Sequence, residues 1–153
     1  MTDKELKYTQ LLKEAAALLD GESDLIANMA NLAALIHETM GFWWTGFYIV
    51  RAGKDGKEQL VLGPFQGPIA CTRIALGRGV CGTSWQRRET VVVPEVEKFP
   101  GHIACSSESR SEIVVPVFKA DKVSAVLDID SRNLNTFDAI DTRYLEQIVE
   151  LLN

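Results

Sequence analysis

Two stretches near the start of the chain repeat apolar residues at the spacing of amphipathic helices. Residues 4–19 (KELKYTQLLKEAAALL) place leucines and alanines along one side of a helix. Residues 23–40 begin near Ser23, a residue type favoured at helix N-termini, and carry an apolar stripe from Leu25 to Met40. The pattern predicts two helices, each with one face suited to cover a core.

The pattern changes to that of strands after residue 40. Residues 42–50 (FWWTGFYIV) are rich in aromatic and β-branched residues, and KDGK at 54–57 is typical of a hairpin turn that leads into a strand at 59–63. Residues 71–76 (CTRIAL) predict a third strand. Residues 77–89 (GRGVCGTSWQRRE) contain three glycines and predict a turn that opens a short helix.

The second half of the chain predicts further strands, a long loop and a final helix. Residues 90–96 (TVVVPEV) predict a short strand, and Pro94 indicates that it lies at a sheet edge or ends there. A long loop over 97–110 follows. Residues 111–131 predict a hairpin, and residues 137–152 a closing helix.

These elements predict the α+β class. A length of 153 residues fits one domain, with the N-terminal helices in 1–40 and the sheet, the long loop and the C-terminal helix in 41–153. We expect an antiparallel sheet of about six strands, with the N-terminal and C-terminal helices packed on one face.

Acidic residues interrupt the apolar pattern of the predicted hairpin. Because alternate residues of a strand share a face, Asp128 and Asp130 point to one side of the sheet, and Leu127 and Ile129 point to the helices. An odd-length turn through residues 119–122 brings Glu112 opposite Asp128 or Asp130. The hairpin is therefore expected to gather three carboxyl groups on the face away from the helices.

Two aromatic residues are expected on the same side of the sheet, because Trp44 and Tyr48 share a face of their strand. Two interpretations of this face stay open. It is either an ordinary wet face with solvated carboxylates, as antiparallel sheets often have, or a site for a cationic ligand. Three repelling acids, in strands where Asp is normally depleted, favour a cation or a carboxyl kept protonated by its neighbours.

Composition and charge exclude several classes of partner. The net charge of −5 argues against nucleic-acid and anionic-membrane surfaces, which select basic faces. No stretch approaches the ~20 apolar residues of a membrane span. The N-terminal MTDKELKYTQ is polar and unlike a secretory or mitochondrial leader. We therefore expect a cytoplasmic protein without nucleic-acid or membrane partners.

The three cysteines, Cys71, Cys81 and Cys105, are candidates for redox chemistry. A reducing cytosol disfavours permanent disulfides, and the cysteines form none of the close pairs usual in zinc sites, so a transient disulfide is favoured over a metal. Cys105 is followed by serines and charged residues, whereas an inert cysteine normally lies among apolar side chains. Cys105 is therefore the candidate reactive thiol.

Three segments together resemble a known family: CTRIALGRGVCGTSW, FPGHIACSSESRSEIVVPV and VLDIDS, in this order. They resemble the free methionine-(R)-sulfoxide reductases, small cytosolic enzymes of oxidative-stress repair built on a single GAF domain. The resemblance extends from about the second helix to the C-terminus. It implies thiol-dependent reduction of free L-methionine (R)-S-oxide to L-methionine.

The resemblance also assigns roles to particular residues. Three thiols are implicated in the redox cycle: Cys105, which attacks the sulfoxide, and Cys71 and Cys81, which resolve the oxidised enzyme. The substrate pocket is formed by three acids and two aromatic residues: Glu112, Asp128, Asp130, Trp44 and Tyr48. Thioredoxin is the implied external reductant, and no bound cofactor is expected.

The chemistry requires a thiolate, a proton for the sulfoxide oxygen and a second thiol. Clustered carboxyls suit the proton donor because crowding raises their pKa, and Asp130 and Glu112 are equal candidates. A sulfenic acid on Cys105 condenses with a nearby thiol. We expect Cys71 as the first resolving thiol and Cys81 as its backup, at a helix N-terminus that favours the thiolate.

Two functions other than catalysis are also compatible with the sequence. The GAF fold also suits a non-catalytic sensor of a small ligand or of redox state, and the N-terminal helices suit a dimerisation module or a homodimer of the enzyme. His102, in the segment PGHI, is expected to hold a turn rather than act as a base. Trp85 is expected in the core.

Overall fold

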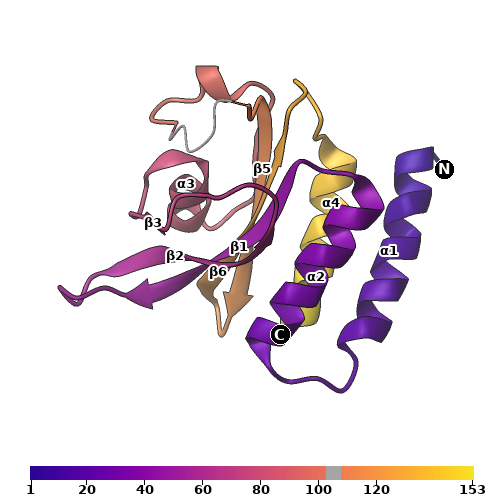
Figure 1. Ribbon diagram of the computed structural model, residues 1–153, viewed down its shortest axis with the longest axis horizontal. Helices are drawn as coiled ribbons and strands as arrows, with labels where there is room; N and C mark the ends of the chain where they lie inside the picture. Colours follow the sequence, from indigo (N-terminus) through magenta and orange to yellow (C-terminus); the bar gives the residue numbers. More distant parts are fainter. Residues whose placement is uncertain (103–107) are drawn as a thin grey trace.

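The computed structural model describes residues 1–102 and 108–153. A six-stranded antiparallel sheet lies between a thick layer of helices and a thinner layer of one helix and loops (Figure 1). The strand order is β3-β2-β1-β6-β5-β4. The strands are β1 (Trp44–Ala52), β2 (Glu58–Gln66), β3 (Arg73–Ile74), β4 (Val91–Val93), β5 (Ser111–Lys119) and β6 (Lys122–Ser131). The predicted α+β class and six-stranded sheet are confirmed.

The thick layer contains α1 (Asp3–Leu19), α2 (Leu25–Met40) and α4 (Ala139–Val149), all on one side of the sheet in Figure 1. Helix α2 packs on β1 and β2, α4 packs on β5, and α1 packs against α2 and α4. The N-terminal and C-terminal helices therefore share one face, as predicted. A short 3-10 turn, η2 (Glu150–Leu152), follows α4.

Buried polar contacts tie α1 to the start of α4. The Tyr8 hydroxyl donates a hydrogen bond of 2.5 Å to Asp141, and the Lys4 ammonium lies 2.7 Å from the other oxygen of this carboxylate. Asp141 is buried, and its carboxylate also accepts from the Asp138 backbone N–H at 2.8 Å. The paired charge keeps an otherwise costly buried carboxylate stable.

Residues that alternate along the central strands fill the core under these helices. Phe47, Ile113, Leu127 and Ile129 are fully buried there. The intervening residues of the same strands face the opposite side of the sheet, as strand geometry requires. The face assigned to Leu127 and Ile129 from the sequence is thus confirmed.

The opposite side of the sheet is covered by α3 (Gly79–Arg87) and by loops, including η1 (Val96–Lys98). A second apolar cluster lies there, and Trp85 packs at its margin. The predicted strand at 71–76 is shorter than expected, because only Arg73 and Ile74 pair with β2. Strand β4 ends before Pro94 at the sheet edge, as predicted. Within residues 1–102 and 108–153, no helix combines the length and apolar character that crossing a membrane requires.

Candidate active site

The register of three neighbouring strands aligns two of the predicted acids and one of the aromatic residues. Glu112 on β5 pairs with Asp130 on β6, and Asp130 pairs with Trp44 on β1. Directly paired residues of antiparallel strands share a face, so their side chains lie side by side. The sequence left open whether Glu112 faces Asp128 or Asp130, and the pairing selects Asp130.

The third acid belongs to the next row. Asp128 pairs with Val114 on one side and with Gly46 on the other. Gly46 is required there because the Trp44 ring lies over its backbone: an added Cβ would come within 2.6 Å of the ring. Because Gly46 has no side chain, the Trp44 ring can lie beside the acids.

The aromatic wall is rigid and anchored at its polar ends. The Trp44 ring stacks on Phe65 at 5.2 Å and on Tyr48 at 6.1 Å between ring centroids. The Trp44 indole N–H donates to the Pro68 carbonyl at 2.9 Å, and the Tyr48 hydroxyl donates to the Cys71 carbonyl, also at 2.9 Å. The rings of Trp44 and Tyr48 thus lie side by side, and Tyr48 is anchored to the backbone of a predicted redox cysteine.

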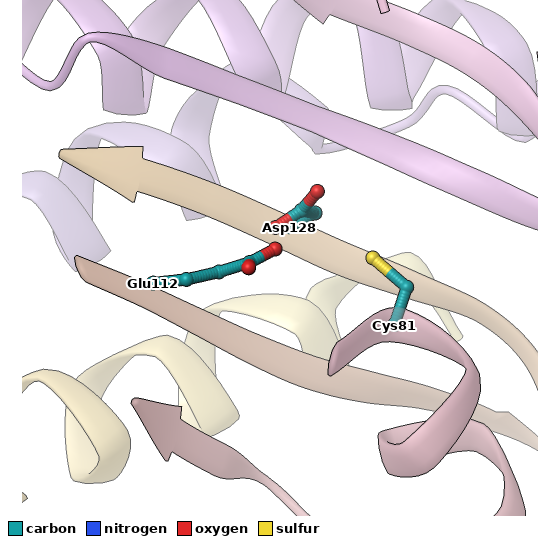
Figure 2. A group of neighbouring side chains, drawn as sticks. All are labelled: Cys81, Glu112 and Asp128. Atoms are coloured by element: carbon teal, nitrogen blue, oxygen red, sulfur yellow. The ribbon is translucent and has the colours of Figure 1, made fainter. Parts of the chain in front are cut away.

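Helix α3 places a thiol over two of the acids. Figure 2 shows the Cys81 side chain directed from the first turn of α3 toward Asp128, with Glu112 pointing toward the same place from β5. The Cys81 sulfur and one carboxylate oxygen from each acid lie within 4.8 Å of one another. All three side chains are buried, and together they are the group in the described chain whose atoms could hold a metal.

A cavity of about 60 Å³ opens at this cluster, well above the ~10–15 Å³ that one water molecule needs. It is lined by the three acids, the two predicted aromatic residues and Cys81, together with residues that the sequence did not assign to a pocket: Trp43, Pro68, Ile69, Ala70, Ile74, Arg78, Gly79, Val80, His102 and Ser109. Five predicted pocket residues and one predicted thiol therefore meet in a single cavity.

Two of the additional lining residues matter for the chemistry. The Ser109 hydroxyl donates to Asp130 at 3.3 Å. His102 forms the predicted turn, donating its backbone N–H to the Phe99 carbonyl at 3.1 Å, and also reaches the cavity. Burial lowers the pKa of His102. Their closeness in sequence to Cys105 was the available signal for a place in the pocket.

The acids are in an environment that disfavours their charged forms. Burial, followed by repulsion from Asp128 and Asp130, raises the pKa of Glu112 well above its usual range. Burial and the charge of Asp128 do the same to the pKa of Asp130. Burial also raises the pKa of Asp128, although hydrogen bonding with Glu112 and Cys81 limits the rise. Glu112 and Asp128 are only 6% exposed, so the wet-face interpretation is wrong.

One oxygen of this cluster is left unsatisfied. Asp128 Oδ1 is buried and has no hydrogen-bond partner among the described residues. Burying a polar atom without a partner costs free energy, so such an atom normally indicates a missing donor or cation.

The thiols differ in their surroundings. Cys81 is free and buried. Burial and the nearby Asp128 and Glu112 raise the pKa of its thiol well above the ordinary value. The expectation that the helix N-terminus favours its thiolate is therefore wrong: desolvation and two acids outweigh the partial charge of one helix end. Cys71 is half-buried and disulfide-bonded. The predicted nucleophile, Cys105, lies outside the described residues.

The chain belongs to the GAF domain family, whose family model matches residues 23–152. GAF domain-containing protein A of Dictyostelium discoideum is 57% identical over 150 residues, which cover 98% of this chain and 92% of the relative. Free methionine-R-sulfoxide reductase of Saccharomyces cerevisiae is 41% identical over 157 residues, covering 99% and 86%. The family resemblance inferred from the sequence segments is thereby confirmed.

A solved structure gives the same result in three dimensions. The X-ray structure of free methionine-R-sulfoxide reductase from Neisseria meningitidis in complex with its substrate matches this fold with a TM-score of 0.94 and 48% identity. The match covers 99% of this chain and 89% of that protein. The fold is thus shared with a structure that holds its substrate.

We expect Glu112→Gln to flatten the pH dependence of the free energy of unfolding. The pKa of Glu112 is higher in the folded protein than in the unfolded chain, so the folded state retains a proton that the unfolded chain loses. The free energy of unfolding therefore falls as pH rises from about 4 through the folded-state pKa. The free energy of unfolding of the variant should exceed that of the wild type by at least about 1 kcal/mol near pH 8, and the two values should match near pH 4.

Urea unfolding at several pH values measures this difference. Glu89→Gln, at an exposed position, is the matched control and should keep the wild-type slope. A slope for Glu112→Gln equal to that of the wild type would show that the buried carboxyl titrates like a solvated one.

Proposed function

We propose that the protein reduces free L-methionine (R)-S-oxide to L-methionine, using thiols as the source of electrons. The observation that carries the proposal is the pocket of three acids and two stacked aromatic residues, in a chain 41–48% identical to free methionine-R-sulfoxide reductases. The match with a substrate-bound structure supports the same conclusion.

Recognition of the free amino acid follows from the charge of the pocket. The ammonium group of an unblocked methionine supplies a cation to the acids and a hydrogen-bond donor to Asp128 Oδ1, which has no partner among the described residues. The methylthio end packs on the aromatic wall, and cation–π attraction to Trp44 can add to the binding. A methionine within a peptide has no such ammonium group and leaves a buried acid unpaired, which typically costs about 2–5 kcal/mol.

The nucleophile in this proposal is Cys105. His102 and Ser109, which flank Cys105 in the sequence, both line the pocket. The Cys105 thiolate attacks the sulfoxide sulfur, the sulfur–oxygen bond of the substrate breaks, and the oxygen ends on the cysteine as a sulfenic acid while methionine leaves. One sulfur is oxidised and the other is reduced by the same two electrons.

The proton for the sulfoxide oxygen comes from the acid cluster. Because the pKa values of Glu112 and Asp130 are both raised, at least one of these carboxyls keeps its proton at a pH where an ordinary one is ionised. A carboxyl that holds a proton near neutrality is suited to general acid catalysis. The two remain equal candidates.

A second thiol then returns the enzyme to the cycle. Condensation of the sulfenic acid with Cys71 releases water and forms a disulfide. The disulfide-bonded state of Cys71 supports its role as first resolving residue. The raised pKa of the buried Cys81 thiol makes it the poorer nucleophile, since the thiolate is the reactive form. Cys81 remains the backup.

Thioredoxin is the proposed external reductant of the disulfide, without a bound cofactor, in a cytoplasmic protein. A homodimer through the N-terminal helices also belongs to the proposal, consistent with exposed Leu18, Leu25 and Ile26 at the end of α1 and the start of α2. The second candidate function, a redox or small-ligand sensor, uses the same pocket without turnover.

A comparison of three sulfoxides tests the function. With a thiol reductant present, we expect methionine from the free R epimer only. The free S epimer should give none, and kcat/KM for the N-acetylated R sulfoxide should be roughly 30-fold lower or more, because a buried acid loses its cation. Chiral chromatography of the products measures this. Comparable rates with the acetylated compound would contradict the ammonium site, and no product from any substrate would favour the sensor.

We expect the first disulfide to join Cys71 and Cys105. Reduced protein is treated with one equivalent of substrate, alkylated, digested and analysed by mass spectrometry. Alkylated Cys81 should accompany the bridged peptides. Cys81→Ser should keep most of the thioredoxin-dependent turnover, and Cys71→Ser should lose most of it after one equivalent of product. A bridge between Cys81 and Cys105 as the earliest product would reverse the order of the two resolving thiols.

The pH profiles of Asp130→Asn and Glu112→Gln identify the general acid. Loss of the true donor should lower kcat by about 100-fold or more and remove the decline of activity at high pH, where that acid deprotonates. Loss of a carboxyl that only binds the substrate should mainly raise KM. Asp121→Asn, at the exposed hairpin turn, is the matched control. Unchanged kcat profiles in both pocket variants would remove the assignment.

A further inference from the structure

Three chemically different elements converge at the floor of the pocket. Cys81 comes from α3, Glu112 from β5 and Asp128 from β6 (Figure 2). One sulfur and two carboxylate oxygens lie within 4.8 Å of one another. In a tetrahedral zinc site, ligand atoms lie roughly 3–4 Å apart, given zinc–sulfur and zinc–oxygen bonds of about 2.3 and 2.0–2.2 Å. Small side-chain rotations therefore suffice to bring the three atoms around one ion.

The donor set distinguishes between cations. Magnesium and calcium prefer oxygen ligands throughout, whereas zinc combines thiolate with carboxylate. The cluster offers one sulfur and two acids, and the cavity beside it leaves room for a water molecule as fourth ligand. Three protein ligands and one open position are the usual arrangement of an accessible zinc ion.

An independent feature points to a ligand at this place. Asp128 is 6% exposed, its Oδ1 atom is buried, and this atom has no hydrogen-bond partner among the described residues. Figure 2 shows this carboxyl beside Glu112 and facing the Cys81 sulfur. An acceptor-only oxygen buried in a group of acids is stabilised by a cation.

We propose that Cys81, Glu112 and Asp128 form a binding site for Zn²⁺, and that zinc bound there excludes the substrate. The exclusion rests on the proposed function, because zinc would occupy the acids that receive the ammonium group of methionine sulfoxide. The zinc site itself does not depend on catalysis. In this proposal Cys81, the poorer resolving nucleophile, controls access of the substrate to the pocket by binding zinc.

The site is tested on the double variant Cys71→Ser/Cys105→Ser of this chain, in which Cys81 is the sole thiol. Cobalt(II) serves as the spectroscopic probe, and zinc is titrated against it. We expect one metal ion per chain, a thiolate-to-cobalt charge-transfer band and displacement of cobalt by zinc. Adding Cys81→Ser should remove the band and weaken zinc binding at least about tenfold.

Asp128→Asn should weaken zinc binding while keeping the thiolate band, and Asp121→Asn at the exposed hairpin turn should bind like the parent. Circular dichroism and urea unfolding establish that each variant is folded. An unaltered zinc affinity after Cys81→Ser, in protein shown to be folded, would overturn the site.

Competition between zinc and methionine sulfoxide tests the exclusion separately from the proposed function. Free methionine sulfoxide should raise the apparent Kd of zinc for the double variant, which cannot turn the substrate over. Zinc binding that is lost with Cys81 but unaffected by methionine sulfoxide would overturn the exclusion. Failure of the proposed function would appear in the assay of three sulfoxides on the native protein, and that result leaves the metal titration unchanged.

Discussion

The register between β5, β6 and β1 is the constraint on which the pocket depends. It places Glu112 beside Asp130 and Asp130 beside Trp44. A slip of one residue would turn the acids into the core under α1, α2 and α4 and turn the residues that now fill this core toward the pocket. Ile113 and Ile129 are fully buried on that other face, so the apolar packing against the helices holds the register. The core thereby determines the geometry of a site that it does not touch.

The same arrangement makes the pocket electrostatically unfavourable without a cation. Three carboxyls share a buried space, their pKa values are raised, and one oxygen of Asp128 has no hydrogen-bond partner within residues 1–102 and 108–153. A structure selected for stability alone would replace such a group by apolar residues. Perturbed acids in a cavity are instead typical of functional sites, where binding of the ligand compensates the cost.

The sequence predicted the features that follow from periodicity. Alternation along β6 was enough to place Asp128 and Asp130 on one face. The predicted odd-length turn is wrong: Lys119 pairs with Lys122, with only Ala120 and Asp121 between them, and a register shift between Val117 and Phe118 brings Glu112 opposite Asp130. The position of α3 could not be predicted, because it depends on packing between segments distant in sequence. For that reason the state of the Cys81 thiol was predicted wrongly: the local helix N-terminus was visible, and the distant acids were not. The place of His102 in the cavity lining was not predicted, because its role in a turn was a sufficient reason for a histidine at this position.

The acids also affect which cysteines of the chain can form a thiolate. A group of buried acids repels a thiolate, and burial together with Asp128 and Glu112 raises the pKa of the Cys81 thiol within the cluster. In the proposed cycle, a resolving thiolate is better placed outside the lining. Cys71 is not a lining residue, although its neighbour Ala70 lines the cavity and its own carbonyl accepts the Tyr48 hydroxyl. Substrate recognition and thiol reactivity place opposite demands on the local charge. Residues in separate segments of the chain can meet both demands where adjacent residues cannot.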